Sequence, residues 1–291
     1  MTIQSKKIKS KILIIGGTGF IGSYVARDLI KKGNSVVVIH RSPLNPMQAI
    51  KGVVYKRDFE LTPQLVKGIE TVIFAPRPDP VVLIKALDFL GRFPKLNKIV
   101  YLSTFGLYPD SLKKQKETAP IVPASQYQRD KYYEEISFTQ FAKRKDIKLC
   151  IARISNPYGD IQNKEMVNKI ICQLLYQTDL TLNGDGNQLR DFIFIEDAAE
   201  LISFLALRKQ SSDHEVFNVC LGKGNSINEV VTILERLSGK KLIFKRQPLP
   251  DSEKKNSIGD NTKIILASRY QIRYSLAEGL KKTLDNYIKN I

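Results

Sequence analysis

The chain has 291 residues, of which 43% are hydrophobic, and it contains no apolar segment long enough to suggest a membrane protein. This length suits one large domain or two small ones. Lys and Arg number 46 against 29 acidic residues, a net charge of +17, but the basic residues are scattered. A lysine-rich composition therefore explains the charge better than a nucleic-acid tract does.

The cysteines and histidines give no sign of a disulfide framework or a metal site. Three cysteines lie far apart in the sequence and form no close pair: Cys150, Cys172 and Cys220. We expect them to be reduced and buried in a cytoplasmic protein. The two histidines have no neighbours at ligand spacing, so no metal is expected.

The first predicted elements are a buried strand over residues 12–15 and a helix that begins near residue 20. A glycine turn joins them, with the spacing Gly16-x-x-Gly19-x-x-Gly22. Such a turn allows a pyrophosphate to approach the backbone closely, and the first backbone N–H groups of the helix point at the anion. The alternative is a plain turn without a ligand. The residues expected to bind the pyrophosphate of NAD or NADP are Gly16, Gly19, Phe20, Ile21 and Gly22.

The second predicted strand, residues 35–39, ends in His40 and Arg41. An acidic residue at this point would accept hydrogen bonds from the ribose hydroxyls of NAD. A guanidinium stands there instead, and it suits the 2′-phosphate of NADP. Arg41 therefore favours NADP as the cofactor, unless it is only a solvated turn residue.

The next two predicted strands also lead to cofactor candidates. A strand over residues 53–55 precedes Asp58 and Phe59, where Asp58 is expected to accept the adenine amino group. After a short helix near residues 63–66, a strand over residues 71–75 ends at Ala75 in a proline-rich loop. Ligands of open parallel sheets sit at this edge, which makes Ala75 a cofactor contact.

A helix near residues 81–90 and a strand over residues 98–102 precede two hydroxyl residues, Ser103 and Thr104. The following helix, residues 126–142, carries Tyr127 and Lys131 one turn apart, on one face. A free phenol is a poor base near neutral pH. A cation a few ångströms away stabilises the phenolate, so Tyr127 is a candidate acid/base. An isolated Tyr-x-x-x-Lys is weak, and a solvated helix face is the alternative.

The order of these features resembles a known family. The stretches that carry the resemblance are Gly-Gly-Thr-Gly-Phe-Ile-Gly at 16–22, Tyr-Leu-Ser-Thr-Phe-Gly-Leu-Tyr at 101–108, Tyr-Gln-Arg-Asp-Lys at 127–131, Arg-Ile-Ser-Asn-Pro-Tyr-Gly at 153–159 and Gly-Asp-Gly-Asn-Gln-Leu-Arg-Asp-Phe-Ile-Phe-Ile-Glu-Asp at 184–197. They resemble extended short-chain dehydrogenases/reductases. More narrowly, the chain is similar to the NAD-dependent epimerase/dehydratase type, whose members act on nucleotide sugars.

The resemblance implies a Rossmann-like, doubly wound α/β fold with a small substrate lobe. The dinucleotide-binding domain would comprise residues 1–156, completed by about 193–221. The lobe would comprise residues 157–192 and 222–291. The helices near Val81 and Gln126 would pair with their copies in a homodimer.

The resemblance also implies residue roles. Thr104 would hold a sugar oxygen, Tyr127 would exchange its proton, and Lys131 would also contact the nicotinamide ribose. The substrate, a nucleotide-diphosphate sugar, would be bound by Ser103, Asn156 and Arg190.

Three functions stay open on these grounds. An epimerase acting at a sugar carbon, with C4 expected, ranks first, and a 4-ketoreductase that consumes NADPH is the alternative favoured by Arg41. Phe105 stands where dehydratases of the family have Asp-Glu, so a 4,6-dehydratase is disfavoured. A non-catalytic RNA-binding or structural relative is the third function, and the presence of Tyr127 and Lys131 argues against it.

Overall fold

The computed structural model describes residues 10–41, 49–57, 66–161, 165–251 and 253–289. The chain divides into two compact units built from alternating segments. The first unit comprises Met1–Ser103, Asp130–Ala152 and Ala199–Val216, and the second Thr104–Arg129, Arg153–Ala198 and Phe217–Ile291. Most of the helix expected near residues 63–66 lies outside the described residues.

A mostly parallel sheet organises the first unit. In the described part of the chain it has seven strands, in the order β10-β6-β5-β4-β1-β2-β3. From β3 to β6 this is the strand order of a doubly wound dinucleotide-binding fold, so the expected Rossmann-like fold is confirmed. The strands are β1 Lys11–Ile15, β2 Ser35–His40, β3 Val53–Arg57, β4 Ile69–Phe74, β5 Lys98–Thr104, β6 Lys148–Ile154 and β10 His214–Val219.

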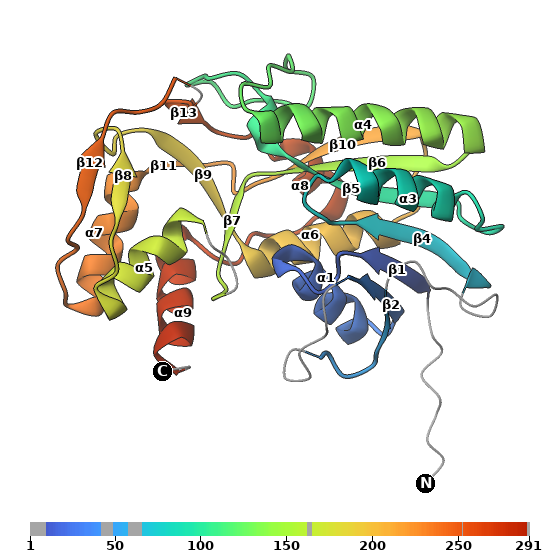
Figure 1. The fold of residues 1–291 in the computed structure, drawn as a ribbon, viewed down its shortest axis with the longest axis horizontal. Coiled ribbons are helices and arrows are strands. Elements are labelled where there is room, and N and C mark those ends of the chain that lie inside the picture. Colours follow the sequence, from blue (N-terminus) through green and yellow to red (C-terminus); the bar gives the residue numbers. More distant parts are fainter. Residues whose placement is uncertain (1–9, 42–48, 58–65, 162–164, 252, 290–291) are drawn as a thin grey trace, which may run out of the picture. The chain divides into compact units, whose positions relative to one another are not determined.

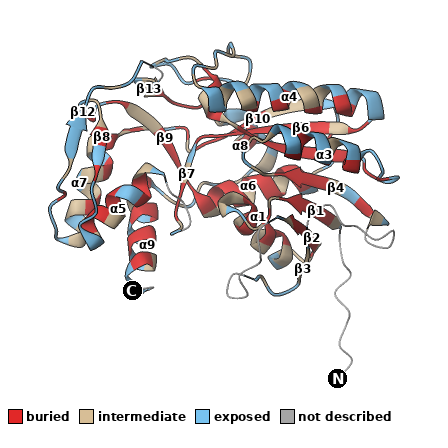
Figure 2. Ribbon diagram, in the orientation of Figure 1, coloured by how far each residue is buried: buried red, intermediate tan, exposed pale blue. Residues whose placement is uncertain are grey.

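Helices cover both faces of this sheet, which explains the unbroken apolar runs of its central strands. Figure 1 shows α3 (Pro80–Leu90) and α4 (Gln126–Lys145) on one face and α1 (Phe20–Lys31) on the other. Figure 2 shows the central strands buried along their length. On the α3 and α4 side the core includes an aromatic group in which the ring of Phe138 lies 4.9 Å from that of Phe74 and 5.0 Å from that of Tyr101.

Apart from the helix expected near residues 63–66, the predicted elements of this unit are confirmed with small shifts at their ends. Strand β5 runs two residues further than expected, so Ser103 and Thr104 are its last two residues. Because side chains of successive strand residues point to opposite faces, the two hydroxyls diverge.

Strand β9 is central to the second unit. It pairs in parallel with β7 and β13 and antiparallel with β11. A separate two-stranded pair joins β8 and β12. The elements are η2 Phe105–Leu107, β7 Asn156–Tyr158, α5 Met166–Tyr176, β8 Thr181–Asn183, β9 Leu189–Phe194, α6 Ile195–Leu207, β11 Gly224–Ser226, α7 Ile227–Ser238, β12 Lys245–Gln247, β13 Asn256–Ser257, α8 Thr262–Ser268 and α9 Leu276–Lys289. Helix α6 begins in the second unit and continues into the first from residue 199.

A fully buried carboxylate, Asp191 on β9, joins several segments of the second unit. It accepts hydrogen bonds from the backbone N–H groups of Leu221 (2.8 Å), Gly222 (2.9 Å) and Gly259 (3.2 Å), and from the hydroxyl of Ser155 (3.2 Å). Four donors satisfy the buried charge. Burial nevertheless outweighs them and raises the pKa of Asp191 to about 6.

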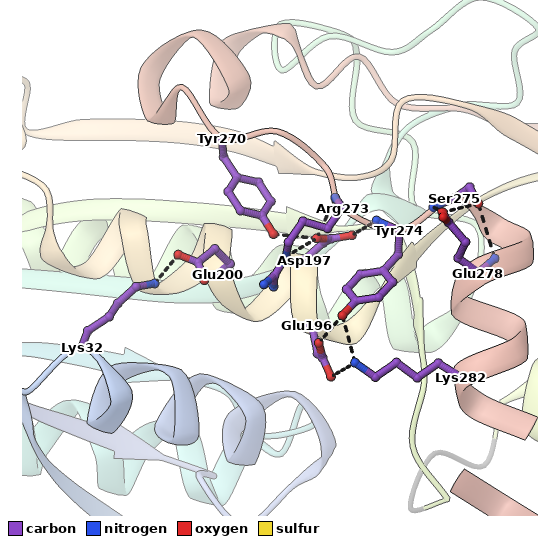
Figure 3. A network of polar contacts seen from close by, with 10 residues as sticks. All are labelled: Lys32, Glu196, Asp197, Glu200, Tyr270, Arg273, Tyr274, Ser275, Glu278 and Lys282. Carbon is purple, nitrogen blue, oxygen red and sulfur yellow. Dashed lines mark hydrogen bonds and ion pairs between the residues drawn. The ribbon is translucent and has the colours of Figure 1, made fainter. Parts of the chain in front are cut away.

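A second buried carboxylate, Asp197 in the first turn of α6, holds the segment before α9 (Figure 3). It accepts hydrogen bonds from the hydroxyl of Tyr270 (2.6 Å) and the backbone N–H groups of Arg273 (3.2 Å) and Tyr274 (3.1 Å). Next to it, Glu196 accepts from Tyr274 and pairs with Lys282 at 2.8 Å. The first turn of α6 thereby fixes the start of the C-terminal helix. Figure 3 also shows Lys32 paired with Glu200, within the first unit.

The raised pKa of Asp191 gives a stability prediction. Because the folded protein binds this proton more tightly than the unfolded chain does, the contribution of Asp191 to stability falls as the pH rises from about 4 to about 6. A pKa raised from 3.8 to about 6 corresponds to about 3 kcal/mol. Since part of the unfolded carboxylate is already ionised at pH 4, the free energy of unfolding of the wild type minus that of Asp191→Asn should be about 2 kcal/mol larger at pH 4 than at pH 7, measured by urea denaturation.

Asp285→Asn is the control, since this carboxylate is exposed on α9. Its difference from the wild type should stay constant over the same pH range. A pH-independent difference for Asp191→Asn as well would contradict the assignment.

Candidate functional site

The glycine turn after β1 is closed by contacts that leave no space for side chains. The Gly16 N–H donates to Ile39 O at 3.2 Å, and the Gly19 N–H donates to Gly16 O at 3.1 Å. Gly16 has a φ of +83°, which favours glycine. A Cβ on Gly22 would lie 2.4 Å from Gly16 O, and one on Gly17 would lie 2.6 Å from a methyl group of Val38. The turn therefore requires glycine for packing at these positions.

This turn fits the pyrophosphate of a dinucleotide. Gly19 is the N-cap of α1 and supplies no side-chain acceptor, and the first turn of the helix holds no acidic residue. The amides of Phe20 and Ile21 belong to that first turn, where a helix offers N–H groups and a partial positive charge to an anion. The residues predicted to hold the pyrophosphate are thus brought together at the carboxyl end of β1.

Of the residues predicted for the adenosine end, the structure describes Arg41, at the end of β2. Arg41 follows β2 directly, and its guanidinium forms an ion pair with Asp79 at 3.0 Å. Asp58 and Phe59 lie outside the described residues. Ala75 follows β4, and its N–H donates to Ile15 O at 2.9 Å, which places it beside the glycine turn.

Lys131 on α4 is buried, with 3% of its surface exposed. Its ammonium donates to Leu102 O at 2.9 Å and to Pro76 O at 3.2 Å, and it pairs with Glu134 at 3.3 Å. Burial lowers the pKa of Lys131, and the charge of Glu134 opposes that shift. These bonds fix the ammonium where β4 and β5 end.

The two hydroxyls at the end of β5 have different surroundings. Ser103, predicted to bind substrate, is buried and donates to the carboxylate of Glu135 at 2.6 Å. Thr104, predicted to hold the sugar oxygen, is partly exposed, and its hydroxyl oxygen accepts from the Gly106 N–H at 3.1 Å. Of the two, Thr104 is better placed to reach a ligand.

Tyr127 stands in the first turn of α4, with 48% of its surface exposed. It belongs to the second unit, whereas Lys131 belongs to the first, and the uninterrupted helix carries both. Four residues apart on one helix, their side chains lie on the same face. The expected helical placement of the tyrosine and the lysine is therefore confirmed.

The residues predicted to bind the diphosphate come from neighbouring strands. Asn156 opens β7 and donates its side-chain N–H to Asp191 O at 2.9 Å. Arg190, on β9, donates to Leu189 O at 3.0 Å and lies 3.5 Å from Glu253. Burial lowers the pKa of Arg190, opposed by Glu253, yet a guanidinium stays charged. The parallel pairing of β7 with β9 puts Asn156 in register with Phe192, two residues along the strand from Arg190.

Sequence reasoning missed a second cation near Arg190. The ammonium of Lys254 donates to the backbone oxygens of Gly106 and Tyr108. Burial lowers its pKa to about 8, and the charge of Arg190 adds to this shift. Neither spacing nor composition distinguishes Lys254 from its many neighbouring lysines.

Sequence reasoning also missed the acidic residues that hold the cations of the first unit. Glu134 follows Lys131 by one helical turn, a spacing that indicates an ion pair. Asp79 precedes Pro80, a pattern typical of a helix N-cap, and its side chain accepts from the N–H groups of Val81 and Val82.

The parallel sheet, the glycine turn and the Tyr-x-x-x-Lys helix define a dinucleotide-binding α/β protein of the short-chain dehydrogenase type. A family model described as the NAD dependent epimerase/dehydratase family matches residues 12–73 and 80–220. The chain belongs to this family, which confirms the resemblance and the expectation of an enzyme.

Relatives match over nearly the whole chain. A putative UDP-glucose 4-epimerase of Methanocaldococcus jannaschii is 27% identical, over 96% of this chain and 98% of that protein. The structure of UDP-glucuronic acid 4-epimerase from Bacillus cereus, in complex with UDP-glucuronic acid and NAD, is 26% identical with a TM-score of 0.84, covering 96% of this chain and 99% of that one. UDP-glucose 4-epimerase from Thermotoga maritima with UDP-glucose is 25% identical with a TM-score of 0.82, covering 96% and 99%.

The described residues contain no group of three or more His, Cys, Asp or Glu side chains able to hold a metal ion. No helix in the same residues is long and apolar enough to cross a membrane.

The contact of Gly22 with Gly16 gives a testable prediction. Alanine favours a helix over glycine by about 1 kcal/mol, but the added Cβ would clash with Gly16 O. Gly22→Ala should therefore lower the free energy of unfolding by about 1–3 kcal/mol and weaken NADH binding. Denaturant unfolding and fluorescence titration measure the two effects.

Lys31→Ala is the control, because it adds alanine at an exposed position in the last turn of the same helix. It should leave both properties near the wild type. If Gly22→Ala kept the stability and the NADH affinity of the wild type, the prediction would be contradicted, because α1 would then be able to shift away from Gly16.

Proposed function

We propose that the protein is an NAD(P)-dependent nucleotide-sugar epimerase that inverts a sugar carbon, with C4 expected, and that Tyr127 is its acid/base. The observation that carries the proposal is helix α4, which presents a half-exposed phenol one turn before a buried, fully hydrogen-bonded ammonium. Membership of the epimerase/dehydratase family supports it.

Tyr127 would take the proton of the sugar hydroxyl during oxidation and return it during reduction. The ammonium of Lys131 favours the phenolate, since an opposite charge nearby stabilises the ionised form. The partly exposed Thr104 hydroxyl would hold the sugar oxygen. When bound, the cofactor accepts and returns a hydride, and the protein supplies orientation and proton transfer.

The proposed substrate is a UDP-hexose. The named relatives are epimerases of UDP-glucose and UDP-glucuronic acid. Asn156 and Arg190 would bind the diphosphate, where the guanidinium forms charge-assisted bonds with phosphate oxygens. In this role Arg190 exchanges its 3.5 Å contact with Glu253 for the substrate.

The cofactor of this proposal is NAD or NADP. The Bacillus cereus relative was determined with NAD. Arg41, which suits a 2′-phosphate, favours NADP and with it the second candidate function, a nucleotide-sugar 4-ketoreductase. The two functions differ in stoichiometry, because a reductase consumes one NADPH per turnover whereas an epimerase recycles its cofactor.

Two further expectations complete the proposal. Three free cysteines accord with a reducing, cytoplasmic location. Helices α3 and α4 expose several large apolar side chains, which suit a homodimer contact through these helices. Their exposed fractions are 60% for Val81, 68% for Ile84, 62% for Tyr133 and 39% for Ile136.

The chemistry is tested with Tyr127→Phe. Removing the phenolic oxygen should lower kcat for UDP-hexose epimerisation by about 10²–10⁴-fold while NADH binding persists. Purified protein is first assayed for bound nucleotide, and then with UDP-glucose and UDP-glucuronic acid by chromatography of the sugar products. Tyr133→Phe, on an exposed part of the same helix, should retain full activity.

Unchanged activity in Tyr127→Phe would contradict the role of this tyrosine. Stoichiometric NADPH consumption with a 4-keto sugar would replace the epimerase with the reductase. Failure to bind either cofactor, together with salt-sensitive RNA binding that persists in Tyr127→Phe, would favour the non-catalytic RNA-binding alternative.

The homodimer is tested with Ile84→Glu. A carboxylate on the proposed contact of α3 should convert the dimer to a monomer, measured by light scattering after gel filtration. Leu266→Glu is the control, because this side chain of α8 is 74% exposed and lies in the second unit. A monomeric wild type, or a dimer that tolerates Ile84→Glu, would contradict this contact.

A further inference from the structure

The ion pair of Arg41 and Asp79 connects two loops of the first unit that are far apart in the sequence. Arg41 is the residue after β2, and Asp79 is five residues beyond the end of β4. Their side chains meet at 3.0 Å, although 38 residues separate them. The position of this pair in the sheet links it to the glycine turn.

Strand β1 lies between β2 and β4 in the sheet. Ile15, the last residue of β1, is in register with Ile39 on one side and Phe74 on the other. Neighbouring strands are about 4.8 Å apart, so a bond from the end of β2 to the loop after β4 spans the carboxyl end of β1. That end leads directly into Gly16, whose own neighbours include Ile39 O and the backbone of Pro76.

The two partners are held unequally. One oxygen of Asp79 accepts from the N–H groups of Val81 (3.0 Å) and Val82 (3.2 Å), and the other accepts from Arg41. These bonds keep the pKa of Asp79 below its ordinary value, the amide of Val82 contributing most. Arg41 directly follows the last residue of β2, and its side chain is 60% exposed. Asp79 is therefore the fixed member, and Arg41 is the one able to turn away.

We propose that Asp79 sets the balance between NAD and NADP by competing with the 2′-phosphate for Arg41. This inference rests on the proposed function, since it needs a dinucleotide on the glycine turn. The ribose of such a dinucleotide lies at the end of the second strand, next to Arg41. A phosphate monoester there, with a charge near −2, gains most from Arg41 when the guanidinium leaves Asp79, because the carboxylate otherwise offsets the positive charge and occupies one of its donors. A 2′-hydroxyl needs no such exchange.

The carboxylate also acts directly. Once Arg41 has turned away, the charge of Asp79 stays near the nucleotide, where it repels a phosphate and not a hydroxyl. Both effects reduce the affinity for NADP relative to NAD. Asp79 is thus a specificity-determining residue that the sequence around Arg41 does not reveal.

The test is Asp79→Asn in the full-length protein. Asparagine is an equally good N-cap and keeps an oxygen for Val81 and Val82, so α3 should stay intact while the charge is removed. Fluorescence titrations with NADH and with NADPH at low ionic strength give the affinity ratio. The ratio should move toward NADPH by about fivefold. The change should be smaller when the titrations are repeated in about 0.5 M salt, where the Debye length is only about 4–5 Å.

Two variants complete the design. Arg41→Ala should move the ratio in the opposite direction, through a loss of NADPH affinity. Asp88→Asn removes an equal charge from the same helix, where Asp88 pairs with Arg92, and should leave the ratio unchanged.

The outcomes separate this inference from the proposed function. Asp79→Asn could bind both nucleotides with the same NADH-to-NADPH affinity ratio as the wild type and Asp88→Asn. That result would overturn the role of Asp79 and leave the proposed function intact. A wild type that binds neither NADH nor NADPH would overturn the proposed function, and this inference with it. Circular dichroism of each variant checks that the fold is retained.

Discussion

The first unit depends on the close approach of α1 to the turn that precedes it. Because Gly22 has no side chain, its backbone lies against Gly16 O, and Gly17 packs on Val38 in the same way. The start of α1 is thereby fixed at the carboxyl end of β1. Strands β2 and β4 flank β1, so Arg41 and Ala75, the first residues after these strands, lie on either side of the carboxyl end of β1. One steric constraint thus arranges every described cofactor candidate before α3.

A second requirement is that the buried ammonium of Lys131 must be paired, since an isolated charge in the interior is strongly destabilising. Two backbone oxygens and Glu134 satisfy it. Glu134 also accepts from the hydroxyl of Tyr101 at 2.7 Å, which ties α4 to β5. Glu135 repeats the arrangement with Ser103. Helix α4 therefore faces the sheet with polar as well as apolar side chains.

The sequence allowed the first unit to be predicted well, because apolar runs and glycines are local signals. The glycine turn, α3 and the placement of Tyr127 and Lys131 on one helix were all confirmed. The pairing of Arg41 with Asp79 was not predictable, since it depends on the strand order. No local pattern placed residues 104–129 in the second unit or brought Lys254 near Arg190. The roles of Thr104, Asn156 and Arg190 remain predictions.

The alternation of the two units along the chain has a consequence for folding during synthesis. The first unit needs residues 199–216, and the carboxylate of Asp191 takes three of its four donors from Leu221, Gly222 and Gly259. Contacts of such high sequence separation form late, because long loops must close first. Neither unit is able to complete its core on the ribosome until most of the chain has emerged. In a nascent chain that stops before β10, the edge of β6 that pairs with β10 has no partner strand, and unpaired strand edges favour aggregation.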